Sequence, residues 1–523
     1  IYQIYPRSFM DSNGDGIGDL AGITQKLGYV ADLGVDAIWL SPFFKSPMED
    51  FGYDISDYRD VDPMFGSLKD FDALTAEAHR LGLKVIIDQV LSHTASGHPW
   101  FVESKKDKTN PKADWYVWAD PKEDGTPPTN WLSVFGGSSW EWSTTRMQYY
   151  MHNFLKSQPD LNFHNPEVRQ ALLDVVRFWL DRGVDGFRLD TVNYYFHDME
   201  LRNNPPYPKG QVFATAPASN PYTFQDHLYD KTRPENLVFL ADLRRLLDGY
   251  EGRMLVGELG VDGPNVGETL AAYTEKDTRP HRSYVCELLP TEFSAAHIRE
   301  VVERLTRDIG DGGVCWSTTN HEVPRVVSRW GVEKNLAQAA PMLWALLLSL
   351  RGSACVYEGE ELGLTEADIP FEQIQDPYGK ALWPEFKGRD GCRTPMPWRK
   401  NDKNGGFSSA APWLPVPAEH LARAVDVEDG DPRSVLSRCR AFTKWRKTVP
   451  ALQTGDIAFL DCPEDCLLFT RGNEVLAAFN LSAAKVSLPV PGTGWRLVDS
   501  LGFGSSDGKT IELMPYDACF MTK

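Results

Sequence analysis

The sequence predicts an α/β protein built on a closed (β/α)8 TIM barrel, with a small irregular domain inserted after strand three and a C-terminal antiparallel β-sandwich. Short apolar runs recur along the chain, and a helix-length amphipathic segment follows each of them, which is typical of a parallel sheet. From about residue 446 this pattern gives way to short strands separated by turns such as "PGTG" and "SSDGK", which indicate the sandwich. A chain of 523 residues is long enough for one large barrel with smaller appended domains.

Eight apolar runs supply the predicted barrel strands, and eight strands with intervening helices favour a closed barrel over an open sheet. The predicted strands are 1–6, 34–42, 82–90, 183–190, 253–258, 283–289, 313–322 and 353–361. An aromatic, loop-rich segment follows the third of them and predicts the inserted domain. The predicted boundaries are 1–92 and 167–445 for the two parts of the barrel, 93–166 for the insert and 446–523 for the sandwich.

Composition excludes several classes of partner. A net charge of -19 and the lack of a basic stripe argue against nucleic acid, and no apolar run is long enough to span a bilayer. The eight cysteines show neither a CxxC motif nor a histidine at zinc spacing. We therefore expect a cytoplasmic protein with free thiols, although the sequence also allows disulfides. It leaves the oligomeric state open.

Four carboxylates fall at the carboxyl ends of separate predicted strands: Asp88, Asp190, Glu258 and Glu322. A single acid at such a position is more often a capping or ion-paired residue. Barrel enzymes, however, place their chemistry at this rim, and four acids on four strands would meet there. The pattern predicts an active site.

The segment "GVDGFRLDTVN" ends a buried strand with Arg188 and Asp190 two residues apart, so both side chains point into the barrel mouth. A neighbouring arginine would keep Asp190 ionised, as a nucleophile requires. Glu258 follows the apolar strand of "MLVGELG", where loss of hydration would raise its pKa and suit it to act as a general acid. Two carboxylates in unlike environments are what glycoside cleavage requires.

The segment "WSTTNHE" adds His321 and Glu322. With "GFRLD" and the strand-end glutamate, it resembles the regions of the α-amylase superfamily, glycoside hydrolase family 13. The segments "IYQIYPRSF", "GYDISDY", "QPDLN", "YEGEELG" and "RDGCRTPMPW" are similar to its α-glucosidase and oligo-1,6-glucosidase branch. The resemblance spans nearly the whole chain and implies a barrel with an inserted domain B and a sandwich domain C.

The resemblance also implies catalytic roles. Asp190 would attack the anomeric carbon and Glu258 would protonate the leaving oxygen and then activate water, with the two carboxyl groups roughly 5 Å apart and the α configuration retained. Glu322 would be the third acid, which grips sugar hydroxyls. The family usually has aspartate there, so this glutamate is a departure, and Ser92 is another, since asparagine is usual before the histidine.

The substrate pocket implied by the resemblance closes beyond one glucose, which makes the enzyme exo-acting. Asp50 and Arg389 would bind the 4-hydroxyl and 6-hydroxyl groups, and Tyr53 would stack on the ring. Phe135 and Phe163 are predicted pocket walls, with core packing as the alternative. The implied substrate-binding residues are Asp50, Tyr53, His93, Phe135, Phe163, Arg188, His321 and Arg389.

The resemblance implies small α-glucoside substrates and sugar or alcohol acceptors. Thr191, after the nucleophile, resembles the α-1,4-acting members, because 1,6-specific members tend to carry valine there. The leading hypothesis is an α-glucosidase that also transfers glucose. The alternatives are an oligo-1,6-glucosidase, a sucrose-isomerising or transglucosidase relative, and a non-catalytic transporter-associated relative.

The loop "DSNGDGIGD" predicts a structural cation site. Its oxygen ligands would be Asp11, Asn13, Asp15, the carbonyl of Ile17, and Asp19. This spacing matches the first part of a calcium loop, and Ca²⁺ is expected, with Mg²⁺ as the alternative. Three aspartates would repel phosphate, which leaves a solvated turn as the competing interpretation. We expect no cofactor for catalysis.

Overall fold

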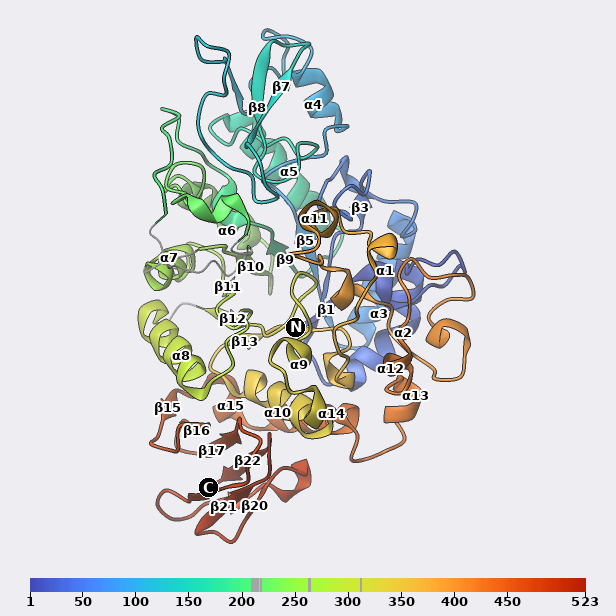
Figure 1. The fold of residues 1–523 in the computed structure, drawn as a ribbon, viewed down its shortest axis with the longest axis vertical. Helices are drawn as coiled ribbons and strands as arrows, with labels where there is room; N and C mark the ends of the chain where they lie inside the picture. Colours follow the sequence, from blue (N-terminus) through green and yellow to red (C-terminus); the bar gives the residue numbers. More distant parts are fainter. Residues whose placement is uncertain (208–215, 217–218, 262–264, 311–312) are drawn as a thin grey trace.

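The computed structural model describes residues 1–207, 216, 219–261, 265–310 and 313–523 (Figure 1). Its largest sheet contains parallel strands in the order β13-β12-β11-β10-β9-β5-β2-β1-β14. The strands are β1 (Tyr2–Ile4), β2 (Ala37–Leu40), β5 (Lys84–Gln89), β9 (Gly186–Leu189), β10 (Met254–Glu258), β11 (Arg282–Tyr284), β12 (Val314–Trp316), β13 (Ser353–Ala354) and β14 (Val356–Tyr357).

The sheet closes on itself through its last two strands. β13 pairs with β12, whereas β14 pairs with β1, and both pairings are parallel. Only Cys355 separates β13 from β14, and its N–H donates to the carbonyl of Trp316 at 2.8 Å. The two pieces are therefore halves of one eighth strand, and the predicted (β/α)8 barrel is confirmed.

Each barrel strand is followed by a long helix at the expected place in the chain. α5, for example, begins where Asn165 caps the N–H of Glu167 and Pro166 occupies the first turn. The long helices are α2 (Leu20–Asp32), α3 (Leu68–Arg80), α5 (Pro166–Asp181), α6 (Asn236–Leu247), α7 (Val266–Tyr273), α8 (Ala295–Ile309), α10 (Leu336–Ser349) and α14 (Val435–Thr448).

Short elements occupy the connections between the barrel strands and helices, and several lie at the end of the barrel that carries the strand-end acids. They are α1 (Pro6–Phe9), α9 (Val326–Arg329), α11 (Pro377–Leu382), α12 (Ala418–Leu421), α13 (Val425–Glu428), β3 (Phe44–Lys45) and β4 (Asp57–Val61), and α15 (Pro450–Thr454) follows α14 and leads into the C-terminal strands. The first predicted strand, 1–6, is shorter than expected because α1 begins at Pro6, a residue whose fixed φ suits a first helical turn.

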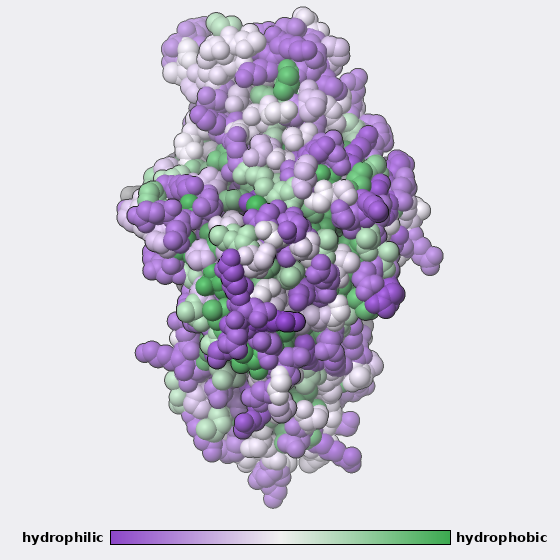
Figure 2. Space-filling view, turned by 90° about the vertical axis from the view of Figure 1, so that its right-hand side faces the viewer, coloured by the Kyte–Doolittle hydropathy of each residue, from purple (hydrophilic) through white to green (hydrophobic). Residues whose placement is uncertain are grey.

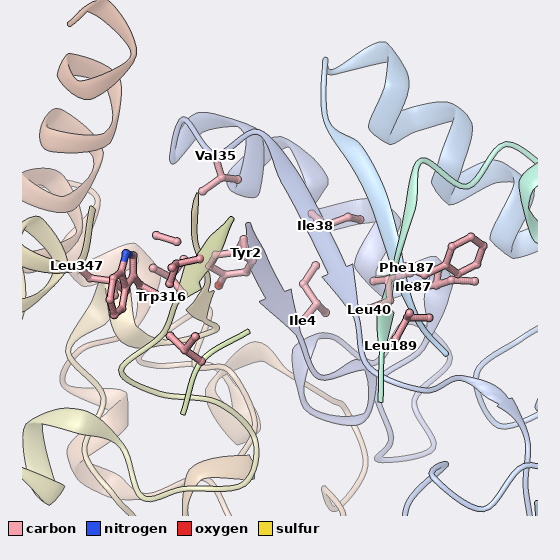
Figure 3. Close-up of a cluster of buried hydrophobic side chains, with 14 of the residues drawn as sticks. Tyr2, Ile4, Val35, Ile38, Leu40, Ile87, Phe187, Leu189, Trp316 and Leu347 are labelled. Carbon is pink, nitrogen blue, oxygen red and sulfur yellow. The ribbon is translucent and has the colours of Figure 1, made fainter. Parts of the chain in front are cut away.

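Alternate residues of the barrel strands face opposite ways. Trp39, Ile86 and Val256 pack together inside the barrel. Their sequence neighbours, such as Leu40 and Ile87, join the larger core between the strands and the outer helices (Figure 3). This period of two determines where the strand-end side chains point. Asp88 lies two residues after Ile86, and Glu258 lies two residues after Val256, so both acids are on the inward face.

The segment between β5 and α5 forms a small sheet of its own, in the order β6-β8-β7. Its elements are α4 (Pro99–Ser104), β6 (Trp118–Ala119), β7 (Trp140–Ser143) and β8 (Gln148–Met151). Figure 1 shows this sheet at one end of the molecule and the C-terminal strands at the other.

The C-terminal region contains two antiparallel sheets, in the orders β15-β16-β17-β22-β19 and β18-β21-β20. Leu468, Leu476 and Ile511 belong to one apolar cluster that joins the two sheets, as in a sandwich. The strands are β15 (Ile457–Phe459), β16 (Cys466–Arg471), β17 (Val475–Asn480), β18 (Val486–Pro489), β19 (Arg496–Leu497), β20 (Ser505–Ser506), β21 (Thr510–Leu513) and β22 (Ala518–Thr522). The exact domain boundaries stay a prediction.

On the face shown in Figure 2, hydrophobic residues lie dispersed among hydrophilic ones. Across the described ranges, none of the helices combines the length and the apolar character needed to cross a membrane.

Candidate active site

Arg188 lies at the centre of the strand-end acids. Its Nη1 is 2.8 Å from Asp88 Oδ1 and 2.6 Å from Asp190 Oδ1, and its Nη2 is 2.5 Å from Glu258 Oε1. The guanidinium carbon lies 4.9 Å from the ring centre of Trp39, which supports it from inside the barrel. The predicted pairing of Arg188 with Asp190 is present, and the same guanidinium also contacts Asp88 and Glu258.

Burial raises the pKa of both predicted catalytic acids. Burial raises the pKa of Glu258 to about 8, against the opposing charge of Arg188. Burial also raises the pKa of Asp190 to about 7, again opposed by Arg188. Burial thus raises both carboxyl pKa values, which suits Glu258 as a proton donor, while Arg188 opposes the rise at Asp190, the acid that must ionise to act as a nucleophile.

Thr191 contacts both acids from the end of β9. Its main-chain N–H donates to Glu258 Oε2 at 3.3 Å, and its hydroxyl donates to Asp190 Oδ2 at 3.2 Å. The residue has a φ of 41°, which is uncommon for a β-branched side chain. Ser92, which stands where the family usually has asparagine, lies next to Thr191. The two hydroxyl oxygens are 3.2 Å apart.

A cavity of about 430 Å³ opens above these acids, a volume within the usual range for small-molecule sites. Several predicted site residues line it, and they come from the βα loops and from the inserted segment. They are Asp50, Tyr53, His93, Phe135, Asp190, Glu258, Glu322 and Arg389.

His321 and Arg188 lie behind the cavity wall rather than on it. The Nε2 of His321 is 2.7 Å from the hydroxyl of Tyr53, and its Nδ1 is 2.8 Å from Gln3 Nε2. Its ring stacks on that of Tyr53 with centres 5.3 Å apart. Both side chains are buried and contact residues that line the cavity, and their direct contact with substrate stays a prediction.

Phe163 does not wall the pocket. Its side chain is 0% exposed and stacks on Tyr195 with ring centres 4.7 Å apart, inside the main hydrophobic core. The alternative interpretation, core packing, describes this residue. Phe154 takes the position at the cavity wall instead, with its ring centre 5.2 Å from that of His93.

Arg389 forms a second ionic centre at the cavity. Its Nη2 lies 2.9 Å from Asp50 Oδ1 and 2.7 Å from Asp376 Oδ1, and its Nη1 lies 3.4 Å from Glu322 Oε1. Asp376 was not singled out from the sequence. No strand-end position or motif marks it, since it lies in the loop before α11.

Sequence reasoning also missed most of the aromatic wall. The rings of Phe135 and Tyr378 lie 4.8 Å apart, as do those of Tyr378 and Phe386. Tyr194 packs on Phe154 at 5.4 Å, and its hydroxyl lies 3.3 Å from Lys231 Nζ. These residues come from separate loops and short helical turns, so no periodicity in the sequence indicated that they meet.

The predicted cation loop is folded by its own hydrogen bonds. Asp11 Oδ1 accepts from the N–H groups of Asn13 and Gly14, and Asp11 Oδ2 accepts from Gly16. Asp19 accepts from Gly22 and begins α2. Among the described residues, no three His, Cys, Asp or Glu side chains converge as a metal cluster. The oxygen donors suit Ca²⁺ in kind, and the site stays a prediction.

Comparisons with known proteins agree on one family. The family model described as the α-amylase catalytic domain matches residues 3–455. A probable alpha-glucosidase of Rhizobium meliloti (strain 1021) is 57% identical over 499 residues, covering 94% of this chain and 90% of that protein. An oligo-1,6-glucosidase of Heyndrickxia coagulans is 37% identical, covering 99% of this chain and 97% of that protein. The crystal structure of an alpha-glucosyl transfer enzyme matches with a TM-score of 0.96 at 56% identity, covering 100% of this chain and 98% of that one.

With these matches, the closed barrel and the paired carboxylates at the ends of neighbouring strands identify a glycoside hydrolase. The chain belongs to the α-amylase family, glycoside hydrolase family 13.

Proposed function

We propose that the protein is a retaining, exo-acting α-glucosidase that releases or transfers glucose from the non-reducing end of short α-glucosides. One observation carries this proposal: the two nitrogens of the Arg188 guanidinium hold Asp190 and Glu258 side by side at the cavity. The Asp50–Arg389 ion pair borders the same cavity.

In the proposed mechanism, an oxygen of Asp190 attacks the anomeric carbon while Glu258 gives its proton to the departing glycosidic oxygen. The bond between that oxygen and carbon breaks, and a covalent β-glucosyl-enzyme forms. Glu258, now ionised, then removes a proton from water or an acceptor hydroxyl, whose oxygen displaces Asp190 from the carbon. Two inversions give net retention.

The exo action rests on the Asp50–Arg389 pair. Asp50 is 4% exposed and Arg389 is 5% exposed, so both charges are largely withdrawn from solvent. Their hydrogen-bonding groups suit the outermost hydroxyls of a terminal glucose, and Tyr53 supplies a ring beside them. A chain that continues past this glucose would have to displace a buried ion pair, which is costly.

The leaning to α-1,4 linkages rests on Thr191. Its hydroxyl touches the nucleophile and lies at the cavity, where a glycosidic oxygen would pass. A hydroxyl at this point can hydrogen-bond a substrate hydroxyl beside the linkage, which the valine of 1,6-specific members cannot.

Transfer to acceptors is supported by the lining of the cavity beyond the acids. Leu289, Pro290, Val323, Pro324 and Phe386 lie there. Such a surface holds the apolar part of an alcohol or the face of a sugar, and a held acceptor competes with water for the glucosyl-enzyme.

We also propose that the Asp11–Asp19 loop binds Ca²⁺. The loop lies at the start of α2 and contacts the distant Ser408, whose hydroxyl donates to Asp11 Oδ2 at 2.5 Å. A bound ion would clamp these two parts of the chain and take no part in the chemistry.

The test is incubation of the purified protein with maltose, isomaltose, sucrose and trehalose, followed by product analysis. From maltose we expect glucose and α-linked transfer products. Proton NMR should show that the glucose is first released as the α anomer. Release of β-glucose would contradict retention. Consumption of sucrose alone, with formation of an isomeric disaccharide, would replace the proposal with a sucrose-isomerising activity.

A further inference from the structure

A buried carboxylate outside the cavity grips the Arg389 guanidinium from behind. The Nε of Arg389 lies 3.2 Å from Asp376 Oδ1 and 3.1 Å from Asp376 Oδ2, and its Nη2 lies 2.7 Å from Asp376 Oδ1. The main-chain N–H of Arg389 also donates to Asp376 Oδ2, at 2.8 Å. Asp376 is 0% exposed, so it touches the guanidinium but not the cavity.

This grip determines which nitrogens remain for the cavity. Two edges of the guanidinium are engaged by Asp376 and Asp50, which leaves Nη1 to meet Glu322 at 3.4 Å. A guanidinium is planar and presents its donors in a fixed fork, so fixing the Nε edge also fixes the direction of Nη1.

The contact with Nη1 bears on the unusual glutamate. The Glu322 side chain is 40% exposed, the least enclosed of the acids at this site, and its carboxylate is drawn toward Arg389. An aspartate would be shorter by one methylene, about 1.5 Å. Starting from 3.4 Å, that shortening would take the carboxylate out of contact with Nη1.

We propose that Asp376 is a positioning residue: by orienting Arg389, it holds the longer Glu322 side chain where it grips the glucosyl group. This proposal rests on the proposed glucosidase function. It assigns Asp376 a role in orienting two cavity residues, beyond a role in stabilising the loop before α11.

The test is a double-mutant cycle with Asp376→Asn and Glu322→Asp, measured as kcat/KM on p-nitrophenyl α-glucoside. Each single variant is expected to lose about tenfold or more. If Asp376 acts through Arg389 on Glu322, either single substitution already breaks the interaction. The kcat/KM of the double variant should then lie within about twofold of that of the worse single variant. Losses that multiply would overturn the proposal, as would an Asp376→Asn variant with wild-type kinetics.

Asp390→Asn is the matched control for loop integrity. Asp390 is also buried, and its Oδ2 accepts the N–H groups of Gln375 and Asp376 at 2.6 Å and 3.0 Å, so it supports the same loop through the main chain. Its effect should multiply with that of Glu322→Asp. If Asp390→Asn is coupled to Glu322→Asp as strongly as Asp376→Asn is, the loop as a whole, and not Asp376, positions Glu322.

A binding measurement separates a failure of the proposed function from a failure of the positioning role. Calorimetry gives the affinity for 1-deoxynojirimycin, a glucose-shaped imino sugar, and needs no turnover. An inactive wild-type protein would refute the glucosidase function, while the same four variants would still report the coupling through binding. Affinity losses in Asp376→Asn and Glu322→Asp that do not multiply are expected. Independent losses in binding would overturn the positioning role whatever the activity.

Discussion

Two layers of the same barrel strands serve opposite purposes. Val256 and Ile86 fill an apolar layer inside the barrel, whereas Glu258 and Asp88, two residues further along the same strands, form a charged layer around Arg188. The apolar layer meets the charged one at Trp39, whose indole N–H donates to Asp88 Oδ2 at 3.2 Å. The charged layer exists only because one arginine compensates three buried acids, and burial there raises carboxyl pKa values instead of strengthening the core.

Breaking the charged layer at the nucleophile should have the largest effect. We expect Asp190→Asn to lower kcat by about 10⁴-fold or more, because no covalent intermediate forms. The thermal midpoint should stay the same or rise, since a buried charge is removed. Turnover and thermal unfolding of the purified variant check both; retained activity would contradict the mechanism.

The pH dependence of kcat/KM should reflect the two acids separately. Activity needs ionised Asp190 and protonated Glu258, so it should rise with pH through about 7 and fall through about 8. With α-glucosyl fluoride, which needs no acid, Glu258→Gln should lose the alkaline limb and keep the acidic one. An unchanged alkaline limb in this variant would contradict the assignment.

The same two pKa values bear on stability. Both carboxyl pKa values are raised in the folded state, so each contribution to stability is fully present below the unfolded carboxyl pKa of about 4 and is lost as pH rises from there through the folded values of about 7 and 8. The thermal midpoint of Asp190→Asn, compared with the wild type, should therefore improve as the pH is raised from about 4 to about 8 and then level off. A constant difference would contradict the raised pKa of Asp190.

A substitution in the apolar layer should lower the free energy of unfolding and leave the catalytic activity unchanged. Val256→Ala should lower the free energy of unfolding by about 2 kcal/mol through the cavity it leaves. Val238→Ala is the matched control: Val238 is 56% exposed, and its loss should change stability by about 0.5 kcal/mol at most. Urea unfolding measures both. A changed pH profile in Val256→Ala would show that the two layers are not separable.

A substitution at the rim of the charged layer should alter the preference between α-1,4 and α-1,6 linkages more than it alters the rate of hydrolysis. Thr191→Val removes the hydroxyl that donates to Asp190. We expect the ratio of isomaltose to maltose kcat/KM to rise by several-fold, on the order of 1 kcal/mol. A ratio that does not move would remove Thr191 as the basis of the linkage preference.

The smallest effect is expected far from both layers, in the Asp11–Asp19 loop. Excess chelator should lower the thermal midpoint by a few degrees, on the order of the roughly 2–4 °C that 1 kcal/mol gives in a large domain. Activity below the midpoint should be unchanged. Asp15→Asn should weaken the response to added Ca²⁺; no response in the wild type would favour the solvated turn.

Sequence reasoning located the charged layer well because barrel strands obey simple rules. Asp190 and Glu258 end apolar runs, and a period of two places them on the inward face. It failed where irregular loops decide position. Phe163 and Phe154 are both aromatics of the inserted segment, and only packing separates the core residue from the cavity wall. Asp376 carried no signal, since its importance comes from a partner, Arg389, thirteen positions away in an irregular connection.

The central C-terminal strands β16, β17 and β22 are buried on both faces. Leu468 and Leu476 pack against the second sheet, whereas Phe469 and Phe479 join the main core beside the barrel helices, where Phe520 meets Phe442 with ring centres 4.9 Å apart. A recombinant fragment cut at residue 455, where the family match ends, would leave this contact surface bare. Such a fragment should aggregate, and the smallest unit suitable for crystallisation or engineering is the barrel together with its sandwich.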